Sequence, residues 1–259
     1  MNSGEKMNSF AKKKINSHLK NWPLLLKFLE KKSKISPATN YCNLYAYAAN
    51  NPLRYIDPDG RSEMYSTEGL YMGTKDDGID GVRIINLGNK STLSTFKDEG
   101  FLKDTDGNLI SCDAFHQLVA MIYGEATGLN VDENKAMGEV VKNRMNESGL
   151  NLLDMLNNKY SHFDARDNQT PKYLSGLQMM VDKTDINKIT RSSDYLRKSI
   201  VGAIHGLSGK KSVLSSAPYY WSHGINRNDA IYEKIETIQT CDFYTLTKDS
   251  WNKNKRYWP

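Results

Sequence analysis

The sequence predicts a mainly helical protein of the α+β class, in which a β-rich segment precedes a helical domain. Beyond Ser111 the apolar residues recur at helical spacing, whereas residues 63–107 hold short β-branched runs separated by glycine, aspartate and asparagine. At 259 residues the chain can bury a core. Its 39% apolar and 25% charged residues are typical of a soluble globular protein, and no membrane span is expected.

Each predicted helix begins and ends at a recognisable signal. Ser111 or Asp113 is expected to cap a helix that ends at Glu125, and Asp132 a second helix that runs through Arg144. Further helices are predicted at 151–158, at 171–183 with proline in the first turn, and at 194–207, which a glycine follows. A short strand is predicted at 240–247.

The composition divides the chain into four parts. Residues 1–36 are basic and are expected to be helical or disordered, and residues 37–62 alternate aromatic and polar residues between turn signals. Residues 63–110 are expected to form one or two β-hairpins, with a strand within 81–87, that link to a catalytic domain at 111–259. The stretch 101–107 is predicted to be a turn, because it has too few oxygen ligands for a calcium loop.

The distribution of lysine, cysteine and histidine argues against several classes of function. The net charge of +5 comes largely from lysines before residue 35, so nucleic-acid binding by the helical domain is not expected. Cys42, Cys112 and Cys241 are far apart and odd in number, and the five histidines form no close pair. The sequence therefore predicts no disulfide framework, no metal and no cofactor.

The N-terminal region predicts no secretory signal peptide. Its only apolar run, residues 22–26, is followed at once by a lysine and by no small-residue cleavage site. If the protein acts outside the cell that makes it, we expect a specialised export route.

Glu125 is the candidate catalytic residue. It follows Phe115, Leu118 and Ile122 on nearly the same helix face, so its carboxylate is expected to face packed, partly dry surroundings. Desolvation raises the pKa of a carboxyl group, which lets it keep a proton near neutral pH and donate it to a leaving oxygen. The alternative is a solvated glutamate near a helix end, with Gly124 or Gly128 as an ordinary stop signal.

A motif before the helical domain carries the first family resemblance. Its residues are Asn43, Leu44, Tyr45, Tyr47, Asn50, Asn51, Pro52, Asp57, Pro58 and Gly60. They resemble the terminal signature of the Rhs/YD-repeat core, which precedes a variable C-terminal domain that is often a toxin. In that family the boundary is cut by aspartyl-type self-cleavage, and Asp57 matches the aspartate of the motif. The repeat array is absent here, so the alternative is that Asp57 only forms a turn.

Five later blocks resemble, in order, the spore cortex-lytic (SleB-like) cell-wall hydrolases. They are residues 122–128, 136–145, 160–163, 205–206 and 216–221. The resemblance implies a lysozyme-like helical fold and cleavage of peptidoglycan between N-acetylmuramic acid and N-acetylglucosamine. Glu125 matches the family's catalytic glutamate, the general acid. Pro218, Trp221 and the segment 160–163 depart from the family pattern, which leaves hydrolysis and lytic transglycosylation both open.

Eight more residues are candidates for substrate binding: Tyr123, Asn143, His162, Phe163, Asp164, Tyr220, Trp221 and His223. The aromatic ones can stack on sugar faces or pack in the core, and Asn143 can bind sugar or end a helix beside a structural Arg144. Asp164 can position a water for hydrolysis or be a plain loop residue, and Glu139 is expected to be solvated.

Together these patterns predict an Rhs-associated antibacterial effector that cleaves peptidoglycan strands in the periplasm or at the cell wall. The expected partners are peptidoglycan, an immunity protein, and an Rhs cage or secretion apparatus. Two alternatives remain open: an Rhs-associated nuclease toxin, and a non-enzymatic module that binds glycans through residues 219–221.

Overall fold

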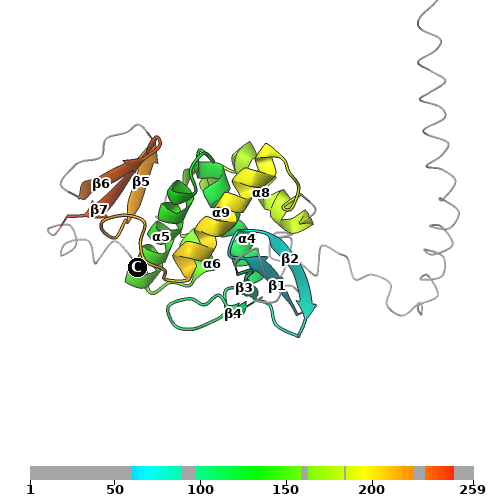
Figure 1. Cartoon of the computed structure of the whole chain (residues 1–259). Helices are drawn as coiled ribbons and strands as arrows, with labels where there is room; N and C mark the ends of the chain where they lie inside the picture. Colours follow the sequence, from blue (N-terminus) through cyan, green and yellow to red (C-terminus); the bar gives the residue numbers. More distant parts are fainter. Residues whose placement is uncertain (1–59, 89–96, 159–162, 184, 224–230, 248–259) are drawn as a thin grey trace, which may run out of the picture. The chain divides into compact units, whose positions relative to one another are not determined.

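The computed structural model describes residues 60–88, 97–158, 163–183, 185–223 and 231–247, and these belong to one compact unit, 55–259 (Figure 1). The described residues form an α+β fold with six helices and seven strands. The basic segment 1–36, the Rhs-like signature up to Asp57 and Pro58, and the candidate His162 lie outside the described residues.

The helices, apart from the short one at Asp164–Asp167, lie close to where the sequence predicts them. They are α4 (Cys112–Glu125), α5 (Val131–Ser148), α6 (Leu152–Asn157), α7 (Asp164–Asp167), α8 (Pro171–Asp182) and α9 (Arg191–Leu207). Ser111 caps α4 as expected, since its side chain accepts from Ala114 N at 3.2 Å. The cap of α5 is Asn130, not Asp132, because Asn130 has the extended backbone of a cap and accepts from Asp132 N at 2.9 Å.

The helices pack around α4, which contacts α8 and α9, while α5 lies along α9. Their shared core contains fully buried residues from four of these helices, among them Phe115, Leu118, Val140, Met180 and Ile200. Gly138 of α5 faces Gly202 and Gly206 of α9, and a side chain at any of these positions would collide with backbone of the other helix. Small residues therefore allow α5 and α9 to approach closely. None of the described helices has the length and apolarity needed to span a bilayer.

A four-stranded sheet precedes the helices and shares their core. It comprises β1 (Arg61–Ser66), β2 (Tyr71–Asp76), β3 (Val82–Asn86) and β4 (Lys97–Phe101), in the order β2-β1-β3-β4. β1–β2 and β3–β4 are antiparallel, and a parallel pairing of β1 with β3 joins the two pairs. Tyr65 of β1 packs on Phe115 of α4 with ring centroids 5.2 Å apart. The predicted turn follows β4, where Asp104 Oδ1 accepts from the backbone N–H groups of Asp106 and Asn108.

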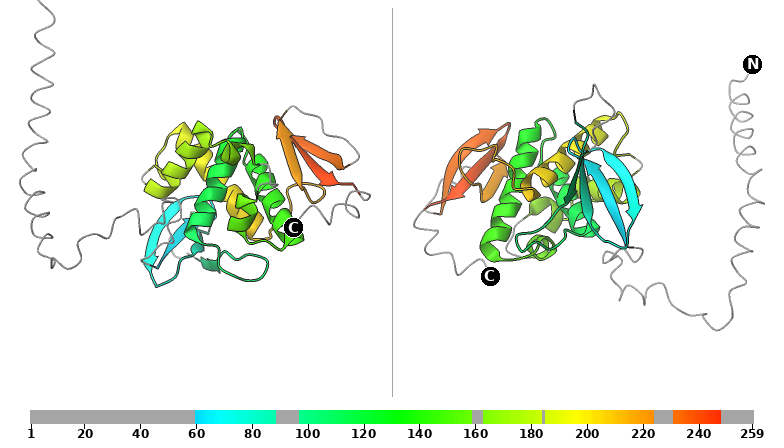
Figure 2. Two further views of the ribbon diagram at one scale, coloured as in Figure 1. Left: turned by 180° about the vertical axis from the view of Figure 1, so that it is seen from behind. Right: turned by 60° about the horizontal axis from the view of Figure 1, so that its bottom comes forward.

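A second, antiparallel sheet of three strands follows α9. Its strands are β5 (Tyr220–His223), β6 (Tyr232–Ile238) and β7 (Cys241–Leu246), in the order β5-β7-β6. β7 matches the strand predicted at 240–247, whereas the sequence did not predict β5 and β6. β5 contacts α5, and Figure 2 shows the sheet beside this helix from two further directions. This contact brings a strand edge to the end of α4.

Candidate functional site

Glu125 is the last residue of α4 and is partly exposed. Its Oε1 accepts a hydrogen bond from the backbone N–H of Ala165 at 2.5 Å. Burial raises the pKa of this carboxyl group, and the charge of Asp164 raises it further. The hydrogen bonds from Ala165 and Trp221 and the charge of His223 lower the pKa, but they do not offset the loss of water, so the pKa lies above 4.5.

The residues around Glu125 explain how the helix ends there. Gly124 lies against Ala165, and a Cβ at Gly124 would be 2.6 Å from the Cβ of Ala165. Ala126 then leaves the helix in an extended conformation while its N–H still bonds Ile122 O at 2.8 Å. The helix therefore ends before Gly128. The missing side chain of Gly124 leaves room for α7 to pack next to the Glu125 carboxylate.

Aromatic residues form a wall beside the carboxylate. The rings of Phe163 and Trp221 stack at 5.6 Å with 20° between their planes, and both are buried. The guanidinium of Arg144 lies 5.1 Å and 5.8 Å from the two ring centroids. Its Nε donates to Tyr219 O at 2.8 Å, and burial lowers the pKa of Arg144 to about 10, so it stays charged at neutral pH. Arg144 therefore stabilises the positions of the Phe163 and Trp221 rings.

The structure brings only part of the predicted substrate-binding set to Glu125. Asp164, Trp221 and His223 act directly on its pKa, and Phe163 stacks on Trp221. By contrast, Asn143 Nδ2 donates to Pro218 O at 2.8 Å and so fixes the chain that leads into β5.

Tyr123 and Tyr220 pack against other residues. Tyr123 is buried, with its ring against Gly176 of α8 and 5.5 Å from Lys172 Nζ. Tyr220 lies on the face of β5 opposite to Trp221, with its ring 5.0 Å from Tyr232 and 5.9 Å from Tyr244.

Three groups near Glu125 were not identified from the sequence. Ala165 contributes only its backbone N–H, which no side-chain pattern can indicate. Lys172 Nζ donates to Ala126 O, and burial lowers its pKa while the charges of Glu133 and Glu125 raise it. Glu133, in the first turn of α5, is typical of a residue that merely complements the helix dipole. In the structure Glu133 is fully buried, and its Oε2 accepts from Thr127 N and Oγ1 at 3.1 Å and 2.5 Å.

The expectation that Glu139 is solvated is wrong. Glu139 is buried, and its carboxylate accepts from Ser212 Oγ, from Val213 N at 2.9 Å, and lies 2.8 Å from His205 Nε2. Burial raises its pKa, yet these hydrogen bonds and the His205 charge outweigh that effect and lower it. Glu139 fastens α5 to α9 and to the segment after it.

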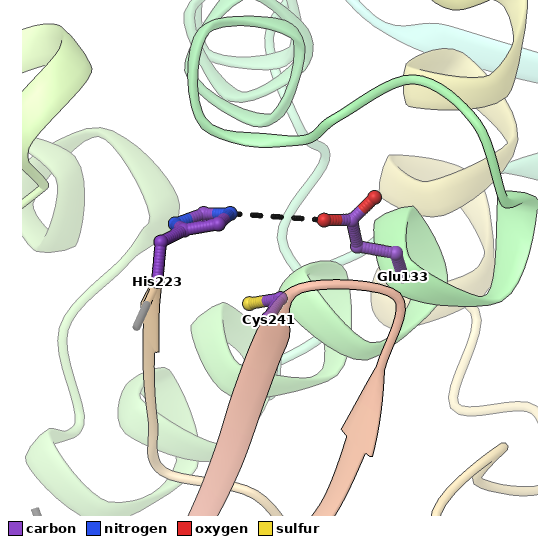
Figure 3. A group of neighbouring side chains, drawn as sticks. All are labelled: Glu133, His223 and Cys241. Carbon is purple, nitrogen blue, oxygen red and sulfur yellow. Dashed lines mark ion pairs between the residues drawn. The ribbon is translucent and has the colours of Figure 1, made fainter. Parts of the chain in front are cut away.

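Within the described ranges, one group of side chains has the donor atoms and spacing to hold a metal ion. It comprises Glu133, His223 and Cys241, whose ligand atoms all lie within 4.8 Å of one another (Figure 3). They come from α5, β5 and β7, and the three side chains converge on one small volume. We refer to them below as the Glu133–His223–Cys241 cluster.

The arrangement around Glu125 is suited to proton transfer. A partly exposed carboxyl group with a raised pKa can give a proton to a leaving oxygen and then take one back. Asp164 is exposed beside it and can meet a ligand from solvent, whereas His223 is partly exposed and lies 3.7 Å from Glu133. The sequence matches no protein-family model and no curated protein, and the fold matches no solved structure.

Proposed function

We propose that this protein cleaves peptidoglycan glycan strands, with Glu125 as the general acid. The observation that carries the proposal is the environment of this one carboxyl group. It is sheltered enough for its pKa to be raised, yet its side chain is still partly open to solvent. A buried structural glutamate would be closed off, and a surface glutamate would have an ordinary pKa.

The surroundings of the carboxylate support a lysozyme-like arrangement. Glu125 ends a central helix packed by α8 and α9, and a strand edge with Trp221 and His223 lies beside it. These elements come from distant parts of the chain and meet at a carboxyl group that is still partly exposed.

In the proposed reaction Glu125 protonates the glycosidic oxygen, and the bond from that oxygen to C1 of N-acetylmuramic acid breaks. The C6 hydroxyl of the same sugar attacks C1 and forms a 1,6-anhydro ring. Its proton passes to the Glu125 carboxylate, which restores the acid for the next cycle. One carboxyl group is sufficient because the nucleophile belongs to the substrate.

Hydrolysis needs a second group that positions a water, since glycosidases generally use two carboxylates. Asp164 is the candidate, because it is exposed and close enough to Glu125 for its charge to raise the pKa of Glu125. The two outcomes differ by one water in the mass of the released muropeptides. Mass spectrometry of digested sacculi therefore distinguishes lytic transglycosylase from muramidase.

The deciding experiment measures the clearing of purified sacculi by the wild-type protein, by Glu125→Gln and by Glu233→Gln. Glu233 is an exposed glutamate of β6, so its variant has the same chemical change without the sheltered setting. We expect wild-type and Glu233→Gln to clear sacculi and Glu125→Gln to lose at least a hundredfold in rate. Equal clearing by all three proteins would overturn the proposal.

The geometry favours an enzyme over a glycan-binding module. Trp221 is only 8% exposed and faces Phe163, while Tyr220 is on the opposite face of β5. Trp221 and Tyr220 therefore do not share one aromatic surface for a sugar chain. Binding to sacculi without release of muropeptides would select the module, and degradation of plasmid or transfer RNA in the presence of Mg²⁺ would select the nuclease alternative.

We further propose that the protein is an Rhs-associated antibacterial effector, which reaches its substrate by a specialised export route and is neutralised in the producing cell by an immunity protein. This part depends on the motif that ends at Gly60. Expression in a Gram-negative host tests it, with and without an added secretion signal. We expect lysis only when the protein is sent to the periplasm, and no lysis with Glu125→Gln in either compartment.

A further inference from the structure

The Glu133–His223–Cys241 cluster combines three different ligand types that the fold places together. His223 and Cys241 are directly opposite each other in the pairing of β5 with β7. Side chains of such a pair have Cβ atoms about 5 Å apart on the same face of the sheet. Glu133 meets them from the first turn of α5 (Figure 3). The residues are 90 and 18 positions apart in the sequence, which is why no linear metal motif is visible.

Glu133 has an unused acceptor that points into this cluster. Its side chain is fully buried, and Thr127 satisfies Oε2 with two hydrogen bonds. Oε1 is buried as well and accepts no hydrogen bond from any described residue. His223 Nε2 lies 3.7 Å from Oε1, which is too far for a hydrogen bond. A buried carboxylate oxygen without a hydrogen-bond partner lowers the stability of the folded protein. We therefore expect Oε1 to bind a ligand.

We propose that Glu133 Oε1, His223 Nε2 and Cys241 Sγ bind a zinc ion, with water in the fourth position. A thiolate, an imidazole and a carboxylate are the donors that Zn²⁺ accepts, whereas Mg²⁺ and Ca²⁺ take oxygen donors. Bonds of about 2.0 to 2.3 Å in a tetrahedron place ligand atoms roughly 3.3 to 3.8 Å apart. The 3.7 Å between His223 Nε2 and Glu133 Oε1 falls within that range. The other ligand atoms are at most 4.8 Å apart, so small side-chain rotations bring them to bonding distance of one metal ion.

Metal binding at this cluster has two physical consequences. The Cys241 thiol is buried and loses its proton to the solvent when it bonds the metal, so the affinity should rise with pH. The metal also joins the first turn of α5 to β5 and β7. Because it binds only the folded arrangement, it should raise the melting temperature of the protein. Neither consequence depends on the function proposed above.

The test uses the full chain, freed of metal by a chelator and then titrated with Co²⁺, which replaces Zn²⁺ and reports on its ligands by absorption. The variants are Cys241→Ser and His223→Gln, and the matched control is Cys112→Ser, which removes the other buried cysteine of the described residues. His223 is 36% exposed, so its variant leaves the core packing intact. Circular dichroism verifies the folding of each variant.

We expect a thiolate-to-cobalt charge-transfer band in the near ultraviolet for wild-type and Cys112→Ser, displaced by Zn²⁺. Cys241→Ser should lose the band, and His223→Gln should bind at least tenfold more weakly. Zn²⁺ should raise the melting temperature of wild-type and Cys112→Ser most, that of His223→Gln less, and that of Cys241→Ser least. The absence of any band in the wild-type protein, or an equal band in Cys241→Ser, would overturn the proposal.

Discussion

Gly124 and Ala165 are in such close contact that a Cβ on Gly124 would lie 2.6 Å from the Cβ of Ala165. This contact lets the backbone N–H of Ala165 reach Glu125 Oε1 at 2.5 Å. The glycine before the candidate catalytic residue therefore positions a hydrogen-bond donor on the neighbouring carboxylate.

The substitution Gly124→Ala should push α7 away and break the hydrogen bond from Ala165 to Glu125. We expect destabilisation of about 1 to 3 kcal/mol and a loss of activity on sacculi. The exchange variant, Gly124→Ala with Ala165→Gly, returns the methyl group to the same space and should recover most of both losses. Urea unfolding and sacculus clearing measure the cycle. Full activity in the single variant would contradict this account.

The raised pKa of Glu125 predicts how activity depends on pH. As the proposed general acid, Glu125 must be protonated before substrate binds, so kcat/KM should fall as pH rises through the pKa of Glu125, which lies above 4.5. The charge of Asp164 contributes to the raised value. Asp164→Asn should therefore move the alkaline decline of kcat/KM to lower pH. A pH profile that does not move in this variant would show that Asp164 is too far away to matter.

The burial that raises the pKa of Glu125 should also lower the stability of the folded protein at neutral pH. The folded pKa of Glu125 is above the unfolded value of 4.5, so the ionised carboxylate destabilises the fold above the folded pKa and has no such effect below 4.5. Glu125→Gln should therefore melt at a higher temperature than wild type at pH 7. The difference should vanish in acid, and Glu233→Gln should match wild type at both pH values. Thermal unfolding at the two pH values measures this.

The elements that the sequence predicted are those with strong local signals. The periodicity of Phe115, Leu118 and Ile122 and the cap at Ser111 were sufficient to locate α4 and to place Glu125 at its end. Pro171 similarly located the start of α8, and the structure adds Thr170 as its cap. β5 has only four residues, and β6 carries three charged residues among its seven without a regular alternation, so neither has enough pattern to identify it.

The parts of the site that the sequence did not predict depend on tertiary contacts. Glu133 and Glu139 both occupy positions on α5 where glutamate is usually solvated, yet both are buried because groups outside the helix bond them. Thr127 bonds Glu133, and Val213 bonds Glu139. Polar residues can be buried when they have such partners, and a single sequence does not reveal the partners.

Arg144 should be sensitive to exchange for lysine although the charge is kept. Its planar guanidinium lies beside Phe163 and Trp221 and donates from Nε to Tyr219 O, and an ammonium group cannot reproduce both contacts. We expect Arg144→Lys to lose about 2 kcal/mol of stability and to slow sacculus clearing, because Trp221 borders Glu125. Arg197→Lys is the control, since Arg197 makes only exposed contacts, and it should change stability by less than about 0.5 kcal/mol.

Glu63 should control the stability of the fold in acid. This buried carboxylate of β1 lies 2.8 Å from His116 of α4, accepts from Tyr65 at 2.7 Å, and pairs with Lys183 after α8. Burial alone raises its pKa, but the hydrogen bonds and charges of His116 and Lys183 outweigh that effect and hold the pKa at about 2.

Because the folded pKa of Glu63 is below the unfolded value of 4.5, its contribution to stability is fully present above pH 4.5 and is lost as pH falls toward 2. Linkage makes that contribution about 3 kcal/mol. Glu63→Gln should therefore be less stable than wild type at pH 7 and should lose less stability on acidification. Urea unfolding between pH 7 and pH 3 measures both curves. Parallel curves for the two proteins would show that the bond between the sheet and α4 does not depend on this charge.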